Sequence, residues 1–382
     1  MCHTINPRLF PEQIAYIVNH AEDEYIFLDP DFMPLVEAIA GECPGVKGWV
    51  VLTDAEHMPA TRLANVHCYE TLLATGATTF DWPELDEKSA CALCYTSGTT
   101  GNPKGVLYSH RSTMLHAYAG MMPDAFGLSG EDVVLPIVPM FHVNAWGNPY
   151  ACPIAGAKIV FPGNKMGDGP TLATLINEEG VTISAGVPTV WLGLLAHLKS
   201  NGLRVDSLRR IIVGGAACPL SIMEDFDSFG VESRVGWGMT EMSPLGSVNA
   251  STGGRHKYSE EEFAKLRLKA GRPIFGVEMK IVDDEGTELP RDGKTSGHLL
   301  VRGPAISSGY YRHDENILDK DGWFNTGDIA NIDELGYMQI TDRDKDVIKS
   351  GGEWISSIEI ENTAVGCEGV AEAAVIGVAH PK

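Results

Sequence analysis

The feature that most constrains the fold of this chain is the alternation of short apolar runs with helical patterns over its first two-thirds. Each run is short enough to be a single strand, and most are followed by a segment with helical periodicity. Such alternation is typical of α/β domains, in which helices flank a mostly parallel sheet. We therefore expect an α/β fold. The expected strands are Gly48–Thr53, Ala90–Thr96, Ala157–Phe161, Val181–Ala185 and Leu208–Val213, and the expected helices are Leu172–Glu179, Thr189–Leu198 and a segment from about Ser112.

A different pattern begins at about Gly271. Short β-rich runs are now separated by clusters of acidic residues and glycine, which are typical of hairpin turns. These clusters lie at 283–286, 291–293, 319–322 and 333–336. They predict a smaller β-barrel-like or meander subdomain over residues 271–341. A last apolar run, Ala371–Val378, predicts a final strand.

Composition excludes several classes of protein. A length of 382 residues corresponds to two or three folded units. With 44% apolar and 21% charged residues, the chain has the composition of a globular protein with a large core rather than of a disordered one. The formal net charge of −22 repels phosphate backbones, so nucleic-acid binding is not expected. Its eight cysteines predict buried thiols rather than a disulfide framework.

One long uncharged stretch, Val133–Ala157, is interrupted by four prolines. Proline breaks a helix, so a stable membrane span is not expected there. The opening residues do not predict a signal peptide. These observations together predict a cytoplasmic location.

The densest chemical signal is the segment Tyr95–Gly105 (YTSGTTGNPKG), which directly follows an expected strand. Glycines let backbone N–H groups approach an anion, hydroxyls add donors, and a lysine adds positive charge. The segment therefore predicts a polyphosphate site. It is not a Walker loop, because Lys104 follows Pro103 and Gly105 stands where Ser or Thr would hold magnesium. The candidate ligands are Thr96, Ser97, Gly98, Thr99, Thr100, Gly101 and Lys104.

This loop resembles the phosphate-binding signature of the acyl-adenylate-forming enzymes, which include acyl-CoA synthetases, luciferase and peptide-synthetase adenylation domains. Three further segments resemble the family's motifs in the family's order: 235–241 (VGWGMTE), 325–328 (NTGD) and 342–361 (DRDKDVIKSGGEWISSIEIE). Residues 3–30 and Phe141–Trp146 resemble the branch of medium- and long-chain fatty acyl-CoA ligases that includes 3-methylmercaptopropionyl-CoA ligases. The resemblance implies an ATP-dependent acid–thiol ligase that forms an acyl-adenylate, transfers the acyl group to CoA and releases AMP and pyrophosphate.

The resemblance also implies roles for individual residues. The loop would hold the β- and γ-phosphates, Thr240 would donate to the α-phosphate, and Glu241 would bind Mg²⁺ together with Thr96. Trp237 would stack on adenine. The remaining nucleotide contacts implied in this part of the chain are Gly214, Gly215, Ala216, Gly236 and Asp328, the last of them to the ribose hydroxyls.

The hinge and the acid side follow from the same resemblance. Arg343 would contact the ribose, Lys345 would be the hinge of a small mobile α+β lid domain, and Lys349 would serve the thioester-forming pose. Trp354 would lie under the hinge. His142 would adjoin the acyl carboxylate and Trp146 would gate the acyl tunnel; on a helix these two residues, four apart, would share a face.

The expected organisation is an adenylation domain at 1–341 followed by the beginning of the lid at 342–382. Compared with the family, the chain lacks the first βα units and the end of the lid, so we expect a fragment. The family's lid lysine falls outside it, and Lys382 does not match that lysine's context. The expected partners are a carboxylic acid, ATP, Mg²⁺ and CoA, with a homodimer as one further expectation. Three alternatives stay open: a short-chain 3-methylmercaptopropionate ligase, a nucleotide-binding chain without catalysis, and an enzyme that loads a carrier protein.

Overall fold

The computed structural model describes residues 1–96, 102–250, 255–343, 348–350, 353–355, 360–361, 364, 370 and 373–376. Contacts divide the chain into two units. The first comprises Met1–His110 with Tyr310–Arg312, and the second comprises Arg111–Gly309 with His313–Lys382.

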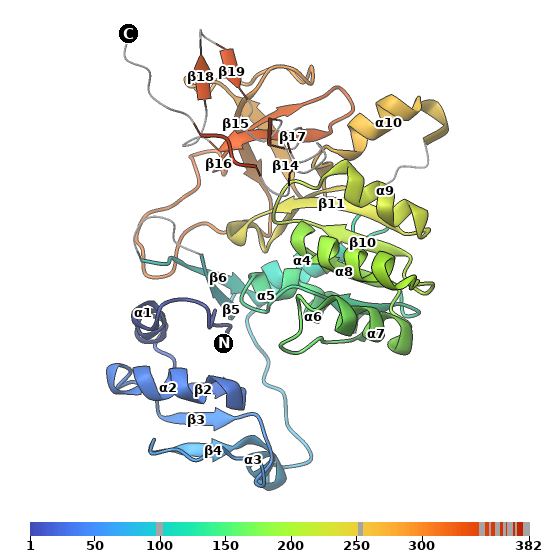
Figure 1. Cartoon of the computed structure of the whole chain (residues 1–382). Helices are drawn as coiled ribbons and strands as arrows, with labels where there is room; N and C mark the ends of the chain where they lie inside the picture. Colours follow the sequence, from blue (N-terminus) through green and yellow to red (C-terminus); the bar gives the residue numbers. More distant parts are fainter. Residues whose placement is uncertain are drawn as a thin grey trace. The chain divides into compact units, whose positions relative to one another are not determined.

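The first unit contains two small sheets (Figure 1). In one, β5 pairs with β1 in parallel and with β6 in antiparallel fashion. In the other, β2, β3 and β4 are parallel. Helices α1 and α2 pack their apolar faces, including Val18 and Val36, with Trp49 and Val51 of β3. The elements are β1 Cys2–His3, α1 Pro11–Ala21, β2 Tyr25–Leu28, η1 Pro30–Phe32, α2 Met33–Ile39, η2 Ala40–Glu42, β3 Gly48–Val51, β4 Val66–Cys68, α3 Tyr69–Thr75, β5 Ala90–Tyr95 and β6 Gly105–Ser109.

A seven-stranded sheet forms the centre of the second unit, in the order β13–β12–β11–β10–β9–β7–β8. Strands β8, β7, β9, β10 and β11 are parallel, whereas β12 and β13 are antiparallel. The elements up to β13 are α4 His110–Met121, β7 Val133–Pro136, α5 Val143–Trp146, α6 Asn148–Ala155, β8 Lys158–Ile159, α7 Gly169–Glu179, β9 Ile183–Gly186, α8 Pro188–Asn201, β10 Arg210–Val213, α9 Leu220–Ser228, β11 Glu232–Gly238, η3 Thr240–Met242, β12 Leu245–Asn249, η4 Arg255–Lys257, α10 Glu260–Arg267 and β13 Arg272–Pro273.

Helices cover both faces of this sheet because its strands are apolar on both sides. In β10, Ile211 and Val213 join the core formed with α7, α8 and α9, which lie side by side in Figure 1. Ile212, between them, packs on the opposite face with Ala119 of α4. Successive side chains of a strand point to opposite faces, so a run such as Arg210–Val213 supports two cores at once.

The end of the described chain is β-rich. Strands β14 Glu278–Val282, β15 Gly297–Arg302, β16 Phe324–Ile332 and β17 Met338–Arg343 form an antiparallel meander around Leu299, Val301 and Met338. Strands β18 Ile348–Ser350 and β19 Glu353–Ile355 form a separate two-stranded sheet. Among the residues described, no helix is long and apolar enough to span a membrane.

The expected α/β fold is confirmed, and each expected strand and helix of the first two-thirds overlaps an observed one. The subdomain at 271–341 has the meander form and is open rather than a closed barrel over its described strands. The final strand expected at Ala371–Val378 is wrong for its described part, 373–376. There the Val375 N–H donates to the Glu361 carboxylate rather than to a neighbouring strand. The division at 341/342 stays a prediction, because most later residues lie outside the described ranges.

Asp132, directly before β7, joins the segments that lead into β7, β9 and β10 of the large sheet. Its Oδ1 accepts hydrogen bonds from Thr182 Oγ1 at 2.8 Å and from Arg209 Nη2 at 2.7 Å. Its Oδ2 accepts from the N–H and the hydroxyl of Ser129, each at 2.8 Å. Burial alone would raise the pKa of Asp132, but these bonds and the Arg209 charge hold it below its ordinary value.

We expect Asp132→Asn to lower the free energy of unfolding near pH 7 by about 1–3 kcal/mol, because an amide cannot accept all these donors. A lowered pKa stabilises the fold above the ordinary value of 3.8 and loses that effect as the pH falls through the folded-state pKa. Urea denaturation at a series of pH values should therefore show the difference shrinking towards acid. Asp206→Asn, at an exposed Arg204 pair, is the control. A difference independent of pH would contradict this assignment.

Candidate active site

The base of the Gly- and hydroxyl-rich loop belongs to the first unit. Strand β5 leads directly into Thr96, whose N–H donates to the Lys104 carbonyl at 2.9 Å and whose Oγ1 accepts from the Lys104 N–H at 3.2 Å. These two bonds close the loop at its stem. Lys104 is exposed, with Nζ 4.8 Å from the centroid of the Tyr310 ring. The other predicted loop ligands, Ser97, Gly98, Thr99, Thr100 and Gly101, lie outside the described residues.

An aromatic and histidine cluster holds both ends of this loop. His20 Nδ1 lies 2.7 Å from the Tyr95 hydroxyl, and the His20 ring meets Tyr311 edge to face at 5.6 Å between centroids. The Tyr311 N–H in turn donates to the Gly105 carbonyl at 2.7 Å. Sequence reasoning missed this cluster, because its members are far apart along the chain and no local spacing connects them.

In the second unit, three predicted segments meet at the carboxyl ends of the parallel strands. Gly214 follows β10, and Gly236 lies in the neighbouring strand β11. A Cβ at Gly214 would lie 3.0 Å from Cη2 of Trp146 and 3.1 Å from the Gly236 carbonyl oxygen. A side chain at Gly214 would therefore displace the indole. This edge of an open parallel sheet is where ligands bind in such folds. Gly215 and Ala216 continue the turn and are exposed.

Trp146 ends a left-handed turn. The φ angles of Val143, Asn144, Ala145 and Trp146 are 36°, 41°, 53° and 55°, and that of Gly147 is 77°. Left-handed backbone costs L-residues about 1–2 kcal/mol each, so the surrounding structure must hold the turn in place.

Two side chains from α6 help to hold this turn. Asn148 Nδ2 donates to the Ala145 carbonyl at 2.8 Å, and the Tyr150 hydroxyl donates to Asn144 Oδ1 at 3.3 Å. The helical spacing considered for His142 and Trp146 does not apply, since the backbone between them has the opposite hand. His142 is exposed.

Trp237, Asp328 and Arg343 form one hydrogen-bonded group. The indole N–H of Trp237 donates to Asp328 Oδ2 at 3.1 Å, and Nε of Arg343 pairs with Asp328 Oδ1 at 2.9 Å. Asp328 and Arg343 are also direct partners in the β16–β17 register. Asp328 is 2% exposed, and its burial raises its pKa, although the Arg343 charge and the Trp237 N–H act to lower it. Trp237 itself packs against the core of the antiparallel sheet.

Thr240 and Glu241 lie in η3, directly after β11. Glu241 is 6% exposed, and its carbonyl accepts the Ser307 N–H at 2.8 Å. Over the described residues, no group of three His, Cys, Asp or Glu side chains could hold a metal ion.

The predicted hinge residues are only partly described. Lys345 lies outside the described residues. Lys349 and Trp354 are placed by their backbones alone, as directly opposed partners of β18 and β19.

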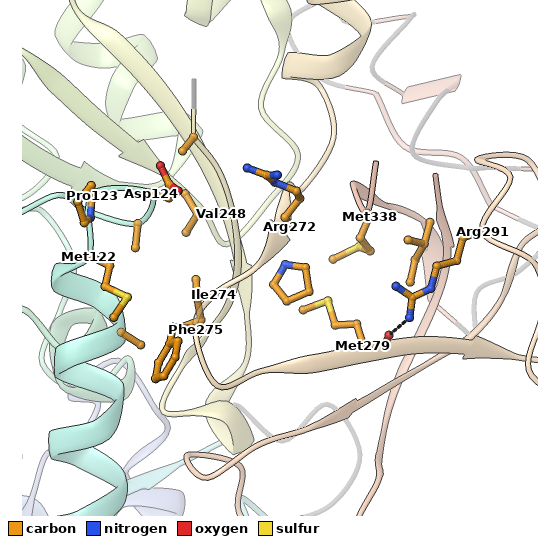
Figure 2. Close-up of a pocket in the computed structure, with 16 residues that line it drawn as sticks. Met122, Pro123, Asp124, Val248, Arg272, Ile274, Phe275, Met279, Arg291 and Met338 are labelled. Carbon is orange, nitrogen blue, oxygen red and sulfur yellow. Dashed lines mark hydrogen bonds between the residues drawn. The ribbon is translucent and has the colours of Figure 1, made fainter. Parts of the chain in front are cut away.

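A cavity of about 540 Å³ lies elsewhere in the second unit, between the end of α4, β12–β13 and the antiparallel sheet. Figure 2 shows Arg272 and Arg291 beside apolar side chains such as Ile274 and Met338. Arg291 donates to the Met279 carbonyl at 2.9 Å. None of the predicted site residues lines this cavity, so cavity size does not identify the site here.

Comparison with known proteins agrees with these motifs. Residues 1–311 match the model of the family described as "AMP-binding enzyme". The chain is 53% identical to 3-methylmercaptopropionyl-CoA ligase of Ruegeria lacuscaerulensis, over 100% of this chain and 71% of that protein. It is 50% identical to medium-chain-fatty-acid–CoA ligase of Ectopseudomonas oleovorans, over 100% of this chain and 70% of that protein.

A solved structure gives the same result for the fold. The anthranilate CoA ligase AuaEII, in complex with anthranoyl-AMP, superposes with a TM-score of 0.86 at 27% identity and covers 99% of this chain and 70% of its own. The family match covers most of the chain. At least half of the aligned positions are identical in each of the two relatives. The loop stem, the glycine turn and Thr240–Glu241 also follow one another in the predicted order. The chain therefore belongs to the AMP-binding enzyme family.

Proposed function

We propose that this chain is an ATP-dependent acyl-CoA ligase that activates an aliphatic carboxylic acid. A carboxylate oxygen attacks the α-phosphorus of ATP, the bond to the bridging oxygen breaks, and pyrophosphate leaves. The thiol of CoA then attacks the acyl carbon of the adenylate, AMP departs with the anhydride oxygen, and the thiol proton is released. The enzyme class, an acid–thiol ligase, is the class of the relatives named above.

One observation carries this proposal. The Trp146 indole borders Gly214, Gly214 borders Gly236, and the next residue, Trp237, bonds Asp328. An apolar side chain suited to an acyl group and a polar group suited to a nucleoside therefore border the adjacent ends of β10 and β11. A reaction that joins an aliphatic acid to the α-phosphate of ATP needs these two environments side by side.

The proposed roles follow the sequence assignments. Thr96–Lys104 holds the β- and γ-phosphates, Thr240 donates to the α-phosphate, and Trp237 stacks on adenine. Asp328 and Arg343 hold the ribose, with Gly214, Gly215, Ala216 and Gly236 permitting close approach. His142 adjoins the acid and Trp146 closes its tunnel. Glu241, with Thr96, binds Mg²⁺, which when bound neutralises charge on the phosphates. Lys345 and Trp354 serve the hinge.

The identity of the acid is open between two classes, since one relative is named for a short thioether acid and the other for medium-chain fatty acids. We propose a fatty acid as substrate and 3-methylmercaptopropionate as the alternative. A panel of butyrate, 3-methylmercaptopropionate, octanoate and palmitate would decide. A cytoplasmic location and a homodimer stay predictions; size-exclusion chromatography with light scattering tests the second.

The experiment that tests the reaction follows pyrophosphate release with ATP, Mg²⁺ and each acid. Release should require all three, and AMP should be the co-product. ADP and phosphate would contradict adenylation. ATP binding without any pyrophosphate release would favour a nucleotide-binding chain without catalysis. Transfer to a carrier-protein thiol but not to CoA would favour the carrier-loading alternative.

We expect Asp328→Asn to raise the KM for ATP by about 10- to 100-fold, because hydrogen bonds to a charged group contribute about 1.5–3 kcal/mol. Stability near pH 7 should be unchanged or higher. A raised carboxyl pKa means that the ionised form is disfavoured by folding, so a neutral amide removes a cost at pH 7. Steady-state kinetics and thermal unfolding check both parts. An unchanged KM would remove Asp328 from the nucleotide site.

Lys349→Ala should separate the two half-reactions. Because Lys349 follows the proposed hinge, we expect it to act mainly in the thioester-forming pose. The rate of CoA transfer should therefore fall by about tenfold or more beyond any fall in the rate of adenylate formation. Single-turnover assays of each half-reaction measure this. Equal losses in both would assign Lys349 to a common step or to the fold.

A further inference from the structure

His116, in the middle of α4, touches two segments of the proposed site that are far apart in sequence. Its Nε2 accepts the Leu245 N–H at 3.0 Å. Its Nδ1 lies 3.0 Å from the position that a Cβ on Gly147 would occupy. Gly147 directly follows the Trp146 turn, and Leu245 begins the strand that follows Thr240–Glu241. One buried ring therefore contacts the ends of both the acid-side and the nucleotide-side segments.

The ring is suited to a fixed position. His116 is 3% exposed, and burial lowers its pKa to about 4, so it is neutral near pH 7. Because Nε2 accepts a hydrogen bond, the ring proton of the neutral form is on Nδ1, the edge that faces Gly147. The Leu245 N–H is itself buried, and a buried N–H that loses its acceptor is costly. His116 thus holds Leu245 in one place.

The segment between Glu241 and Leu245 transmits this placement. The Met239 N–H donates to the Pro244 carbonyl at 3.0 Å, and the Ser243 hydroxyl donates to the Ala305 carbonyl at 2.7 Å. The Met239–Pro244 bond connects the residue before Thr240 to the residue before Leu245, so a shift of Leu245 is passed to the start of the Thr240–Glu241 segment.

The Trp146 turn is connected to the same ring. Its left-handed backbone is unfavourable for L-residues and needs support. Gly147 has a φ of +77° and no side chain, which allows the turn to approach the His116 ring. Trp146 also packs into the apolar cluster that contains Leu245. Moving His116 would therefore alter the position of the indole relative to Thr240.

We propose that His116 is a positioning residue that sets the acid-side turn, 143–147, in register with the Thr240–Glu241 segment. It touches neither reactant. It acts through Gly147 on one side and Leu245 on the other, so that the acid and the α-phosphate meet in reactive geometry. This inference rests on the proposed adenylation reaction. Misplacement by about 1 Å costs about 100-fold in rate in well-aligned reactions.

The test is a split between kcat and KM. His116→Leu, which removes the acceptor, should lower kcat for pyrophosphate release by about 10- to 100-fold per active site, while the KM values for ATP and acid change by less than about threefold. The fraction of active sites is measured by the burst of adenylate. His116→Gln, whose amide oxygen can accept the Leu245 N–H, should recover most of the loss.

Two further variants separate positioning from stability. Met223→Ala removes a fully buried side chain from the core on the other face of the sheet and should lower stability without lowering kcat per active site. Gly147→Ala keeps the histidine but places a methyl group against it, so it should reproduce the kcat loss. In the double variant His116→Leu, Gly147→Ala, kcat should fall no further than in the more impaired of the two single variants, because both substitutions act on one contact.

Several results would overturn the proposal. The first is a kcat of His116→Leu that stays within about threefold of the kcat of the unsubstituted chain, and the second is a change in KM without a change in kcat. The others are a His116→Gln variant whose kcat is no higher than that of His116→Leu, and a Met223→Ala variant whose kcat falls as much as that of His116→Leu. If the unchanged chain releases no pyrophosphate, the proposed function fails first. The inference fails separately if the unchanged chain is active and the His116 variants show no kcat loss. Should His116→Leu not fold, Gly147→Ala and the Gln variant still decide.

Discussion

Glu241→Gln is expected to lower the rate of pyrophosphate release by about 100- to 10,000-fold, or about 1.36 kcal/mol of activation free energy per decade. The substitution keeps the shape of the side chain and removes its charge. Glu241 is buried, and its carbonyl accepts the Ser307 N–H, so its segment is held in place. The barrier is largely electrostatic, because two anions approach while charge gathers on the phosphates. Stopped-flow or coupled assays of pyrophosphate measure the effect.

Titration with Mg²⁺ makes this prediction specific. The Gln variant should need a higher Mg²⁺ concentration for its residual rate, whereas loss of a purely structural carboxylate would leave that concentration unchanged. Glu278→Gln is the matched control, since that carboxylate, on β14, is exposed and pairs with Arg302 of β15. It should lose almost nothing. An unchanged rate in Glu241→Gln would remove Glu241 from the metal site.

Trp146→Ala is expected to change chain-length preference, raising the ratio of kcat/KM for octanoate over butyrate by about tenfold, or about 1.4 kcal/mol. The indole lies against Gly214, at the edge where the acid is proposed to bind. Removing it opens space for a long chain and takes contact away from a short one. Each buried methylene contributes about 0.8 kcal/mol, so a long acid can compensate where a short one cannot.

Stability must be measured beside this ratio, because Trp→Ala in a core costs up to about 3–5 kcal/mol. Trp191→Phe is the matched control: that indole is fully buried on the face that α7, α8 and α9 cover, with its N–H donating to the Gly186 carbonyl at 3.2 Å. The control should lose stability and keep the chain-length profile. If folded Trp146→Ala also keeps the profile, Trp146 is a packing residue and its assignment as a gate is wrong.

Local sequence signals were sufficient to predict strands β8, β9 and β10 of the large sheet. The runs at β9 and β10 are buried on both sides and bounded by glycine or polar turns, so their state depends little on distant contacts. The Ala371–Val378 run shows the limit of this reasoning. An apolar run becomes a strand only when a neighbour offers hydrogen-bonding partners, and at Val375 the partner is a carboxylate.

The handedness of the Trp146 turn could not be predicted from the sequence for a related reason. Spacing of four residues predicts a shared face only if the backbone is right-handed. The left-handed angles of Val143–Trp146 are held by Asn148 and Tyr150 and by the room that Gly147 leaves. No pattern of residue types within FHVNAW encodes that support.

By itself, the sequence determined the α/β class, the family and the order of the site segments, because periodicity and motif spacing are properties of neighbouring residues. Only the tertiary structure decided which of these segments touch. It placed Trp146 against Gly214, bonded Trp237 to Asp328 across 91 positions, and set His116 between Gly147 and Leu245. Such contacts depend on strand order and on helix packing across the sheet. No local sequence pattern predicts them, because the residues involved are far apart along the chain.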